Sequence, residues 1–374
     1  MSRPSIPFID LKAQYAFLKP SVDKRIQQVL DHGQYIMGPE VKELELALEH
    51  YTQAKHCITV SSGTEALLIA LMALGIGPGD EVITTSFTFA ATAEVIVLVG
   101  AKPVFVDIDP ATCNIDPALI EAKITSRTKA IMPVSLYGQA ANLDAINEIA
   151  ARHGNLPVIE DAAQSFGATS NGRKSCNLSS IGCTSFFPSK PLGCYGDGGA
   201  IFTNDDAIAQ ACREIRVHGQ SKRYTHTRVG VGGRMDTLQC AVVLAKLERF
   251  EWEIAQRIAL GQRYIELIKQ ANIPVKLIHV EEGNKCVWGQ FTIMLDNREA
   301  VQAKLQEAGV PTAVHYPIPM NQQPAYAHLC CPDCTPLAAK AGQRVMSLPF
   351  SPDVSEATQV YVVQELAKAI RSVA

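Results

Sequence analysis

The residues best suited to catalysis surround Lys190. This lysine lies between Pro188 and Pro191, and several glycines follow it before Ala200. The two prolines fix the direction of the loop, and the glycines let the backbone turn tightly or approach a ligand. An ordinary surface lysine needs no such surroundings. A constrained lysine amine can bond covalently to a carbonyl compound and, once released, can move protons.

Asp161 is the second candidate, because it ends an apolar run that begins at Val158. Such a run predicts a buried strand. Burying a carboxylate at the end of this strand costs free energy unless a cationic group pairs with it. Gln164 follows shortly after and could hydrogen-bond the same ligand. An isolated aspartate here could instead cap the turn that begins at Ala162. We therefore expect Asp161 to pair with a cationic ligand or to cap that turn.

The segment Ser61–Thr64 follows a predicted strand and opens a predicted helix. The free N–H groups and the positive end of the dipole at a helix start favour an anion such as phosphate. Serine, glycine and threonine are also ordinary capping residues, so this motif alone is weak. Ser185, which precedes Lys190 on the same loop, is a further candidate phosphate ligand.

One cofactor accounts for a constrained lysine, a buried carboxylate and a phosphate cradle together, namely pyridoxal 5′-phosphate (PLP). Its aldehyde forms a Schiff base with a lysine, and its ring becomes an electron sink when the protonated nitrogen pairs with a carboxylate. We therefore expect Lys190 to carry PLP and Asp161 to face the ring nitrogen. Pyridoxamine 5′-phosphate is then expected as the intermediate form of the cofactor.

Short apolar runs alternate with helical patterns from about Cys57 to Thr203. This alternation is typical of an α/β fold with βαβ units around a mainly parallel sheet. In such sheets ligands bind at the carboxyl ends of the strands, where the candidate residues lie. A long helical pattern from Met235 to Lys269 is expected to bridge to a smaller α/β domain. We predict a large PLP-binding domain over residues 1–250, with an N-terminal arm, and a small C-terminal domain over residues 251–374.

Size and charge exclude several classes of protein. A chain of 374 residues with a net charge of -3 can bury a sizeable core and has no basic field for nucleic acid or an anionic membrane. The apolar stretch Phe89–Val106 is interrupted by charged residues, glycine and proline, which favours a buried helix and strand over a membrane span. Met1–Lys12 lacks the apolar core of a secretion signal. We expect a cytoplasmic protein that acts on small molecules.

The 11 cysteines form no regular framework, so we expect reduced thiols packed as small hydrophobic residues. One cluster, Cys330, Cys331 and Cys334, could bind a metal ion. A zinc site needs about four ligands, and no second pair with this spacing stands elsewhere in the sequence. We therefore expect no metal site and interpret the cluster as part of a surface loop.

In order along the chain, these motifs resemble those of the DegT/DnrJ/EryC1/StrS family of sugar aminotransferases. The similar segments are Ser62–Thr64, Thr88–Thr92, Glu160–Ser165, Ser185–Lys190 and Gly196–Gly199. The resemblance extends over essentially the whole chain. It implies the fold-type I architecture of PLP-dependent aminotransferases and a homodimer with active sites at the subunit boundary. It also implies L-glutamate as the amino donor, released as 2-oxoglutarate.

The resemblance also implies a role for each matching residue. Lys190 is expected to be the catalytic Schiff-base lysine, Asp161 the partner of the ring nitrogen, and Phe89 the side chain stacked on the ring. The other expected cofactor contacts are Gln164 to the ring oxygen and Gly63, Thr64 and Ser185 to the phosphate. Gly232 stands where the family usually has an asparagine that reaches the phosphate of the neighbouring subunit. A backbone N–H could replace that contact.

Further segments resemble the subgroup that aminates UDP-2-acetamido-2-deoxy-3-oxo-glucuronate for O-antigen sugars of lipopolysaccharide. They are Ser175–Ser179, Val217–Arg228 and Pro311–Pro319. The implied partners are therefore a UDP-sugar and L-glutamate, without nucleic acid or membrane. His218 lies in one of these segments and has no assigned role.

Four residues are candidates for binding the sugar. Arg228 and Arg234 carry planar guanidinium groups that suit the carboxylates of a uronate and of glutamate. His315 and Tyr316 lie in a Pro-rich loop that could close over the sugar. An arginine on a loop is also often a solvated charge, and a histidine in a rigid turn is often structural. Both interpretations stay open for these residues.

Two alternative functions remain at this point. The enzyme could aminate C4 or another keto nucleotide sugar, because the discrimination depends on the geometry of the pocket. The chain could also be a non-catalytic PLP-binding regulator. The intact set of Lys190, Asp161 and Gln164 argues against a regulator.

Overall fold

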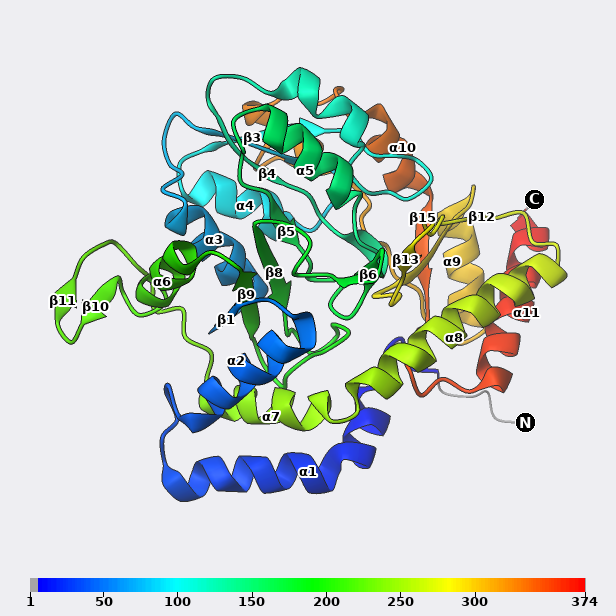
Figure 1. Cartoon of the computed structure of the whole chain (residues 1–374). Helices are drawn as coiled ribbons and strands as arrows, with labels where there is room; N and C mark the ends of the chain where they lie inside the picture. The colour runs from blue at the N-terminus through cyan, green and yellow to red at the C-terminus, as the bar shows by residue number, and fades with distance from the viewer. Residues whose placement is uncertain (1–5, 374) are drawn as a thin grey trace.

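The computed structural model describes residues 6–373 and is built around one central sheet (Figure 1). A four-stranded and a three-stranded sheet are joined by parallel bridges Ile131–Val158 and Val134–Asp161, which gives the order β3-β2-β4-β5-β8-β9-β1. β9 is antiparallel to both neighbours, and the other pairs are parallel. The strands are β1 (His56–Val60), β2 (Glu81–Thr85), β3 (Lys102–Val106), β4 (Thr128–Met132), β5 (Ile159–Asp161), β8 (Ile181–Ser185) and β9 (Gly199–Thr203).

Helices cover both faces of this sheet. Helices α3 (Gly63–Ala73), α4 (Ala90–Leu98) and α6 (Asp206–Ile215) pack on one face, and α2 (Pro39–Thr52), α5 (Leu143–Arg152) and α7 (Thr237–Leu247) pack on the other. In β1, for example, Cys57 packs with α2 while Ile58 packs with α3. Burial on both faces explains why the strands are apolar throughout. The mainly parallel α/β sheet expected from the sequence is confirmed.

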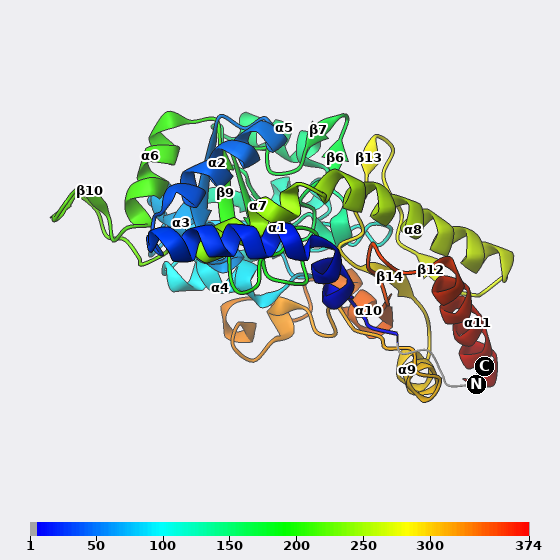
Figure 2. The same ribbon diagram turned by 90° about the horizontal axis from the view of Figure 1, so that it is seen from below.

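The N-terminal segment adds a helix outside these layers. Helix α1 (Leu11–His32) lies along α7, as Figure 2 shows from below. Asp10 caps it by accepting a hydrogen bond from the N–H of Ala13 at 2.9 Å. Leu18 and Val22 pack against Val242 of α7. The sequence analysis expected only an N-terminal arm here.

The rest of the chain forms a second, smaller α/β unit. Its antiparallel sheet has the order β12-β14-β15, with β12 (Lys276–Leu277), β14 (Phe291–Met294) and β15 (Val345–Leu348). Helices α8 (Phe250–Gln270), α9 (Arg298–Glu307) and α11 (Glu356–Val373) pack against it. Helix α8 runs from α7 to this sheet, and it contributes Phe250 to the core of the large unit and Tyr264 to that of the small one. The domain boundary at residue 250 stays a prediction, because α8 belongs to both cores.

The single helix expected over Met235–Lys269 is wrong. The structure has two helices there, since α7 ends at Leu247 and α8 begins at Phe250. Neither glycine nor proline marks the break. Arg249, at the break, forms an ion pair with Asp353 at 2.7 Å and stacks on the ring of Trp252. The ion pair with Asp353 is a tertiary contact at this break, and the periodicity of the sequence does not reveal it.

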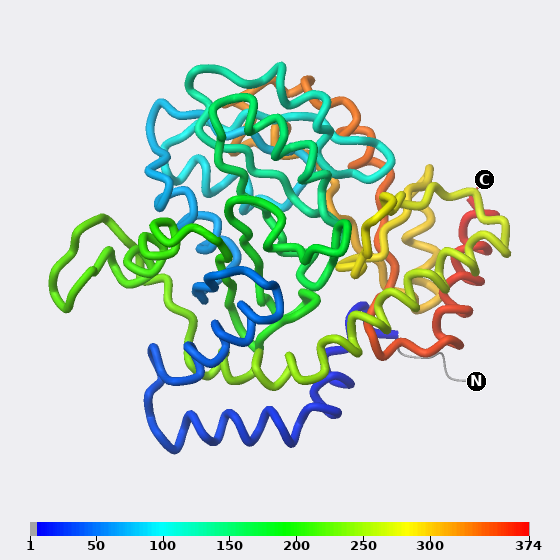
Figure 3. Tube along the Cα trace, in the orientation of Figure 1, coloured from blue at the N-terminus to red at the C-terminus, as the bar shows by residue number. Residues whose placement is uncertain are grey.

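Several short elements complete the fold. A hairpin of β10 (Gln220–Lys222) and β11 (Thr225–His226) extends away from the body of the molecule (Figures 1 and 3). A small sheet of β13 (Asn284–Lys285), β6 (Thr169–Ser170) and β7 (Arg173–Lys174) joins the two units. The remaining elements are α10 (Pro336–Arg344) and the 3-10 turns Pro117–Leu119, Glu121–Lys123, Leu136–Gly138, Met320–Gln322 and Ala327–Leu329.

Other expectations can be compared with the same structure. Phe89–Val106 divides mainly into α4 and β3, and within residues 6–373 no helix combines the length and apolar character needed to cross a bilayer. The cysteines are free thiols, most of them buried, and the Cys330–Cys334 cluster lies in a partly exposed loop. The expectation for Met1–Lys12 falls partly outside the described residues.

Candidate active site

The candidate residues meet at the carboxyl edge of the central sheet. Asp161 ends β5, Ser185 ends β8, and Ser62–Thr64 follow β1. These three strands run in the same direction, so their carboxyl ends lie at one edge. There they line a cavity of about 460 Å³. The same cavity is lined by Phe89, Gln164, Lys190, Gln290, His315 and Tyr316.

Lys190 lies in the loop after β8, where its N–H donates to the carbonyl of Phe187 at 2.9 Å. No hydrogen bond or ion pair within residues 6–373 engages its amine. Burial lowers the pKa of Lys190 below its ordinary value, and the charge of Asp161 partly opposes this shift. A larger share of the amine is therefore unprotonated near neutral pH and able to act as a nucleophile or base.

Asp161 is a buried carboxylate held by two neutral donors. Its Oδ1 accepts from the N–H of Ala163 at 3.1 Å, and its Oδ2 accepts from the Thr92 hydroxyl at 2.8 Å. Thr92 in turn lies 3.0 Å from the hydroxyl of Thr88. Burial raises the pKa of Asp161, while the bond from Thr92 opposes the rise most, followed by the Ala163 N–H and Lys190. The carboxylate thus caps its turn, and a cationic ligand would further stabilise its charged form.

Gln164 links the large unit to the second unit at the cavity. The Oε1 atom of Gln164 accepts from the N–H of Tyr137 at 2.9 Å, and its Nε2 donates to the Tyr316 hydroxyl at 3.1 Å. Tyr137 donates its hydroxyl to the carbonyl of His315, whose Nδ1 lies 2.9 Å from Ser347 Oγ. Burial, followed by the charge of Lys190, lowers the pKa of His315 to about 4. The imidazole is therefore neutral near pH 7.

The start of α3 is suited to an anion. Ser62 caps the helix by accepting from the N–H of Glu65 at 3.0 Å, and the first N–H groups of a helix have no acceptor within it. A Cβ atom at Gly63 would lie 2.6 Å from Ser185 Cβ, so only glycine lets the helix start abut β8. Thr64 completes this end of the cavity. A phosphate would gain both the N–H donors and the helix dipole.

The lining therefore fits PLP. Lys190 offers an unengaged amine, Asp161 offers a carboxylate that lacks a cationic partner, and the start of α3 offers phosphate donors. Phe89, 56% exposed at the mouth, offers an aromatic face for the ring. A cluster of three or more residues able to hold a metal ion is absent from residues 6–373.

Arg228 and Arg234 do not line this cavity in their own chain. Arg228 Nε forms an ion pair with Glu214 at 2.7 Å at the base of the β10–β11 hairpin. A Cβ atom at Gly232 would lie 3.2 Å from the ring of His218, so a larger residue there would require that ring to shift. Sequence reasoning also missed Gln290, which lies just before β14. Only the largely apolar run Phe291–Leu295 that follows it could have drawn attention to it.

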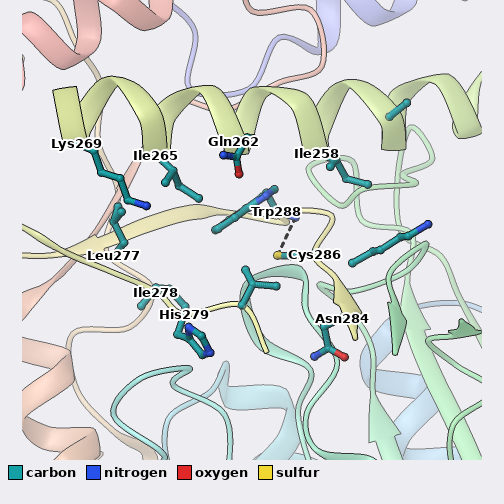
Figure 4. Close-up of a pocket in the computed structure, with 13 residues that line it drawn as sticks. Ile258, Gln262, Ile265, Lys269, Leu277, Ile278, His279, Asn284, Cys286 and Trp288 are labelled. Atoms are coloured by element: carbon teal, nitrogen blue, oxygen red, sulfur yellow. Dashed lines mark hydrogen bonds between the residues drawn. The ribbon is translucent and has the colours of Figure 1, made fainter. Parts of the chain in front are cut away.

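A larger cavity of about 830 Å³ lies between α8 and the small sheet (Figure 4). Gln262 and Ile265 extend from α8 towards Trp288. This cavity shares no lining residue with the Lys190 cavity, and no aspartate or glutamate lines it. The constellation that can perform acid, base and nucleophilic chemistry belongs to the smaller cavity.

A lysine and a buried carboxylate at the carboxyl edge of this sheet define a PLP-dependent enzyme. The sequence model of the DegT/DnrJ/EryC1/StrS aminotransferase family matches residues 18–367, and the chain belongs to this family. It is 60% identical over 353 residues to UDP-2-acetamido-2-deoxy-3-oxo-D-glucuronate aminotransferase of Pseudomonas aeruginosa, covering 94% of this chain and 97% of that protein. It is 46% identical over 369 residues to a pleiotropic regulatory protein of Geobacillus stearothermophilus, covering 98% and 99%.

Solved structures share the fold. An aminotransferase of this family from Brucella abortus superimposes with a TM-score of 0.94 at 42% identity, covering 97% of this chain and 99% of that one. NtdA of Bacillus subtilis, solved with bound pyridoxamine phosphate, superimposes with a TM-score of 0.92 at 32% identity, covering 99% and 86%. The expected fold-type I architecture, the aminotransferase class and the PLP cofactor are confirmed.

Proposed function

We propose that the protein transfers an amino group from L-glutamate to C3 of UDP-2-acetamido-2-deoxy-3-oxo-glucuronate, for the O-antigen sugars of lipopolysaccharide. The 60% identity to the Pseudomonas aeruginosa enzyme over 94% of the chain is the observation that carries this proposal. The free thiols agree with the reducing cytoplasm as the place of the reaction.

Lys190 and Asp161 carry the chemistry in this proposal. When bound, PLP supplies an electron sink for the carbanion that forms when the amino-bearing carbon loses its proton. Lys190 would hold the cofactor covalently, and its amine, once released, would accept the proton from that carbon and serve as the proton donor for the reverse transfer. Its lowered pKa favours the unprotonated amine that the first transfer requires. Asp161 would keep the ring nitrogen of the bound cofactor protonated.

The other proposed cofactor contacts are supported by the lining of the cavity. Gln164 would reach the ring oxygen, and Phe89 would stack on the ring; both line the cavity. The phosphate would bind at Gly63, Thr64 and Ser185, where the helix start and the serine hydroxyl provide donors. His315 and Tyr316 line the same cavity and would contact the sugar.

We propose a homodimer in which Arg228 and Arg234 reach the sugar in the site of the partner subunit. The β10–β11 hairpin extends away from the body of the molecule (Figures 1 and 2). Tyr224, in this hairpin, and Val229, just after it, are 80% and 83% exposed. Phe187, at the mouth of the cavity, is 50% exposed. Exposed apolar side chains of this kind favour a protein interface.

The proposal is tested with purified holoenzyme, L-glutamate and the 3-keto sugar nucleotide. We expect formation of 2-oxoglutarate and of a C3-amino sugar, measured by mass spectrometry, and no product from Lys190→Ala. Faster turnover of a 4-keto sugar nucleotide would contradict the substrate assignment. No conversion of glutamate with any keto sugar would favour a regulator, the function named for the Geobacillus stearothermophilus relative.

A further inference from the structure

Gln290 is a cavity residue whose hydrogen bonds the protein does not complete. It directly precedes β14 and lines the cavity with Lys190 and His315. Its Oε1 atom is buried and has no hydrogen-bond donor within the described chain, residues 6–373. A buried amide oxygen without a donor is costly, so a ligand that supplies a donor there gains binding free energy.

The backbone on both sides of Gln290 is held in place. A Cβ atom at Gly289 would lie 2.6 Å from the carbonyl of Gln164, so the chain passes directly against the segment that holds Gln164. Arg257 Nη1 donates to the carbonyl of Trp288 at 3.1 Å, and Phe291 pairs with β15. Gln290 is therefore held at the wall of the cavity by a fixed segment of the second unit.

The free acceptor distinguishes between the two substrates. Both carboxylates of glutamate offer only acceptor oxygens, and its ammonium group is the group that reacts. A nucleotide sugar with an acetamido group offers hydroxyl and amide N–H donors. The amide of Gln164, by contrast, already bonds Tyr137 and Tyr316. Among residues 6–373, Gln290 is therefore the amide of this cavity whose buried oxygen lacks a donor.

We propose that the Gln290 carbonyl accepts a hydrogen bond from a hydroxyl or the acetamido N–H of the sugar and so determines specificity for the sugar substrate. This inference rests on the proposed function. Gln290 acts in the sugar half of the reaction and not in the glutamate half. It is thus a specificity residue separate from Lys190 and Asp161.

The test uses holoenzyme and UDP-2-acetamido-2-deoxy-glucuronate, which keeps a hydroxyl at C3 and cannot be aminated. Gln290→Met preserves the length of the side chain and removes both polar atoms. We expect the Kd of this variant for the sugar nucleotide, measured by isothermal titration calorimetry, to rise about tenfold or more. One hydrogen bond is lost, and the donor of the sugar is left without an acceptor. The rate of the glutamate half-reaction, followed by the absorbance of the bound cofactor, should fall by a much smaller factor than sugar binding.

A second variant and a control sharpen the result. Gln290→Glu retains acceptor oxygens and should bind the sugar more tightly than Gln290→Met. Gln262→Met, in the separate cavity of Figure 4, should match the wild type, because Gln262 bonds only Glu266 at 2.9 Å.

Three outcomes would overturn the assignment. An unchanged Kd in Gln290→Met would remove Gln290 from sugar binding and leave the proposed function intact. Equal losses in sugar binding and in the glutamate half-reaction would indicate a structural role. A wild type that converts glutamate but does not bind this sugar would contradict the proposed function together with the inference.

Discussion

Asp161 lies between an apolar strand and the cavity, and only neutral donors hold its carboxylate in the described chain. Thr92 donates to Oδ2 at 2.8 Å, so the position and the charge of the carboxylate depend on a threonine hydroxyl. The Thr88 hydroxyl supports Thr92 in turn. This chain of hydroxyl groups keeps Asp161 directed at the place where the ring nitrogen is proposed to bind.

Thr92→Val should lower kcat about tenfold or more, because a hydrogen bond to a charged group contributes roughly 1.5–3 kcal/mol. Without this bond the pKa of Asp161 rises further, and the pH at which the absorbance of the bound cofactor changes should shift. Steady-state kinetics and a pH titration of the absorbance measure both effects. Thr84→Val is the control, since Thr84 bonds the carbonyl of Met132 and not Asp161. A variant with the kinetics and titration of the wild type would contradict this role.

His315 gives a pH dependence of stability. Its folded pKa is about 4, below the unfolded value of about 6.5, so the unfolded chain binds an extra proton between these values. The contribution of the neutral imidazole to the free energy of unfolding is fully present above about pH 6.5 and is lost as the pH falls towards 4. The melting temperature of the wild type should therefore fall more between pH 7 and pH 5 than that of His315→Gln. Equal decreases in both proteins would contradict the buried, neutral imidazole.

Sequence motifs were sufficient to place the residues that lie next to strand ends. Lys190 and Asp161 were found because proline, glycine and apolar neighbours mark their local structure, and the structure brings both to one cavity. Gln290 was missed because no local pattern marks it and only the folding of β14 brings it to the cavity. Arg228 was expected at the sugar, yet its own chain pairs it with Glu214. Its proposed role depends on a second subunit, which one sequence does not position.

A helix cap also joins the two units of the chain. Asp107, just after β3, accepts hydrogen bonds from the N–H groups of Leu337 and Ala338 at 2.8 Å each. These groups belong to the first turn of α10, whose preceding residue Thr335 provides no side-chain cap. The carboxylate thus satisfies free N–H groups and the dipole of a distant helix.

Asp107→Ala should destabilise the protein by about 1 kcal/mol, within the range of roughly 0.5–2 kcal/mol for the loss of a helix cap. Thermal unfolding of the apoprotein measures this as a lower melting temperature. Asp116→Ala is a suitable control, because Asp116 caps only the exposed three-residue turn Pro117–Leu119 through Ala118. Equal melting temperatures for the two variants would show that the cap on α10 contributes no special stability.

Elements with strong local signals were predicted well, and those set by distant contacts were not. Helix α3 begins within Ser61–Thr64, where the sequence predicted a helix start, and α4 lies within Phe89–Val106, where it predicted a buried helix. The break between α7 and α8 depends on the pairing of Arg249 with Asp353, which lies 104 positions further along the chain. Periodicity reports only local preference, so it joined the two helices into one.

For the whole molecule, the exposed hairpin and the apolar mouth of the cavity favour a dimer. Sedimentation should give twice the chain mass of 40.5 kDa. Val229→Glu should shift the protein towards monomer, because a buried interface charge without a partner is costly. Leu119→Glu, on another exposed element, should leave the mass unchanged. A wild type that sediments as a monomer at micromolar concentration would contradict the shared active site.

Lys190 is the lysine that we propose carries the cofactor. Lys246 is the sharpest competitor, since burial lowers its pKa to about 8 and its amine lies over the ring of Tyr195. Borohydride reduction of the holoenzyme fixes PLP on the lysine that holds it, and peptide mass spectrometry then identifies that residue. We expect the added mass on the peptide that contains Lys190. Cofactor found on Lys246, or on any other lysine, would contradict it.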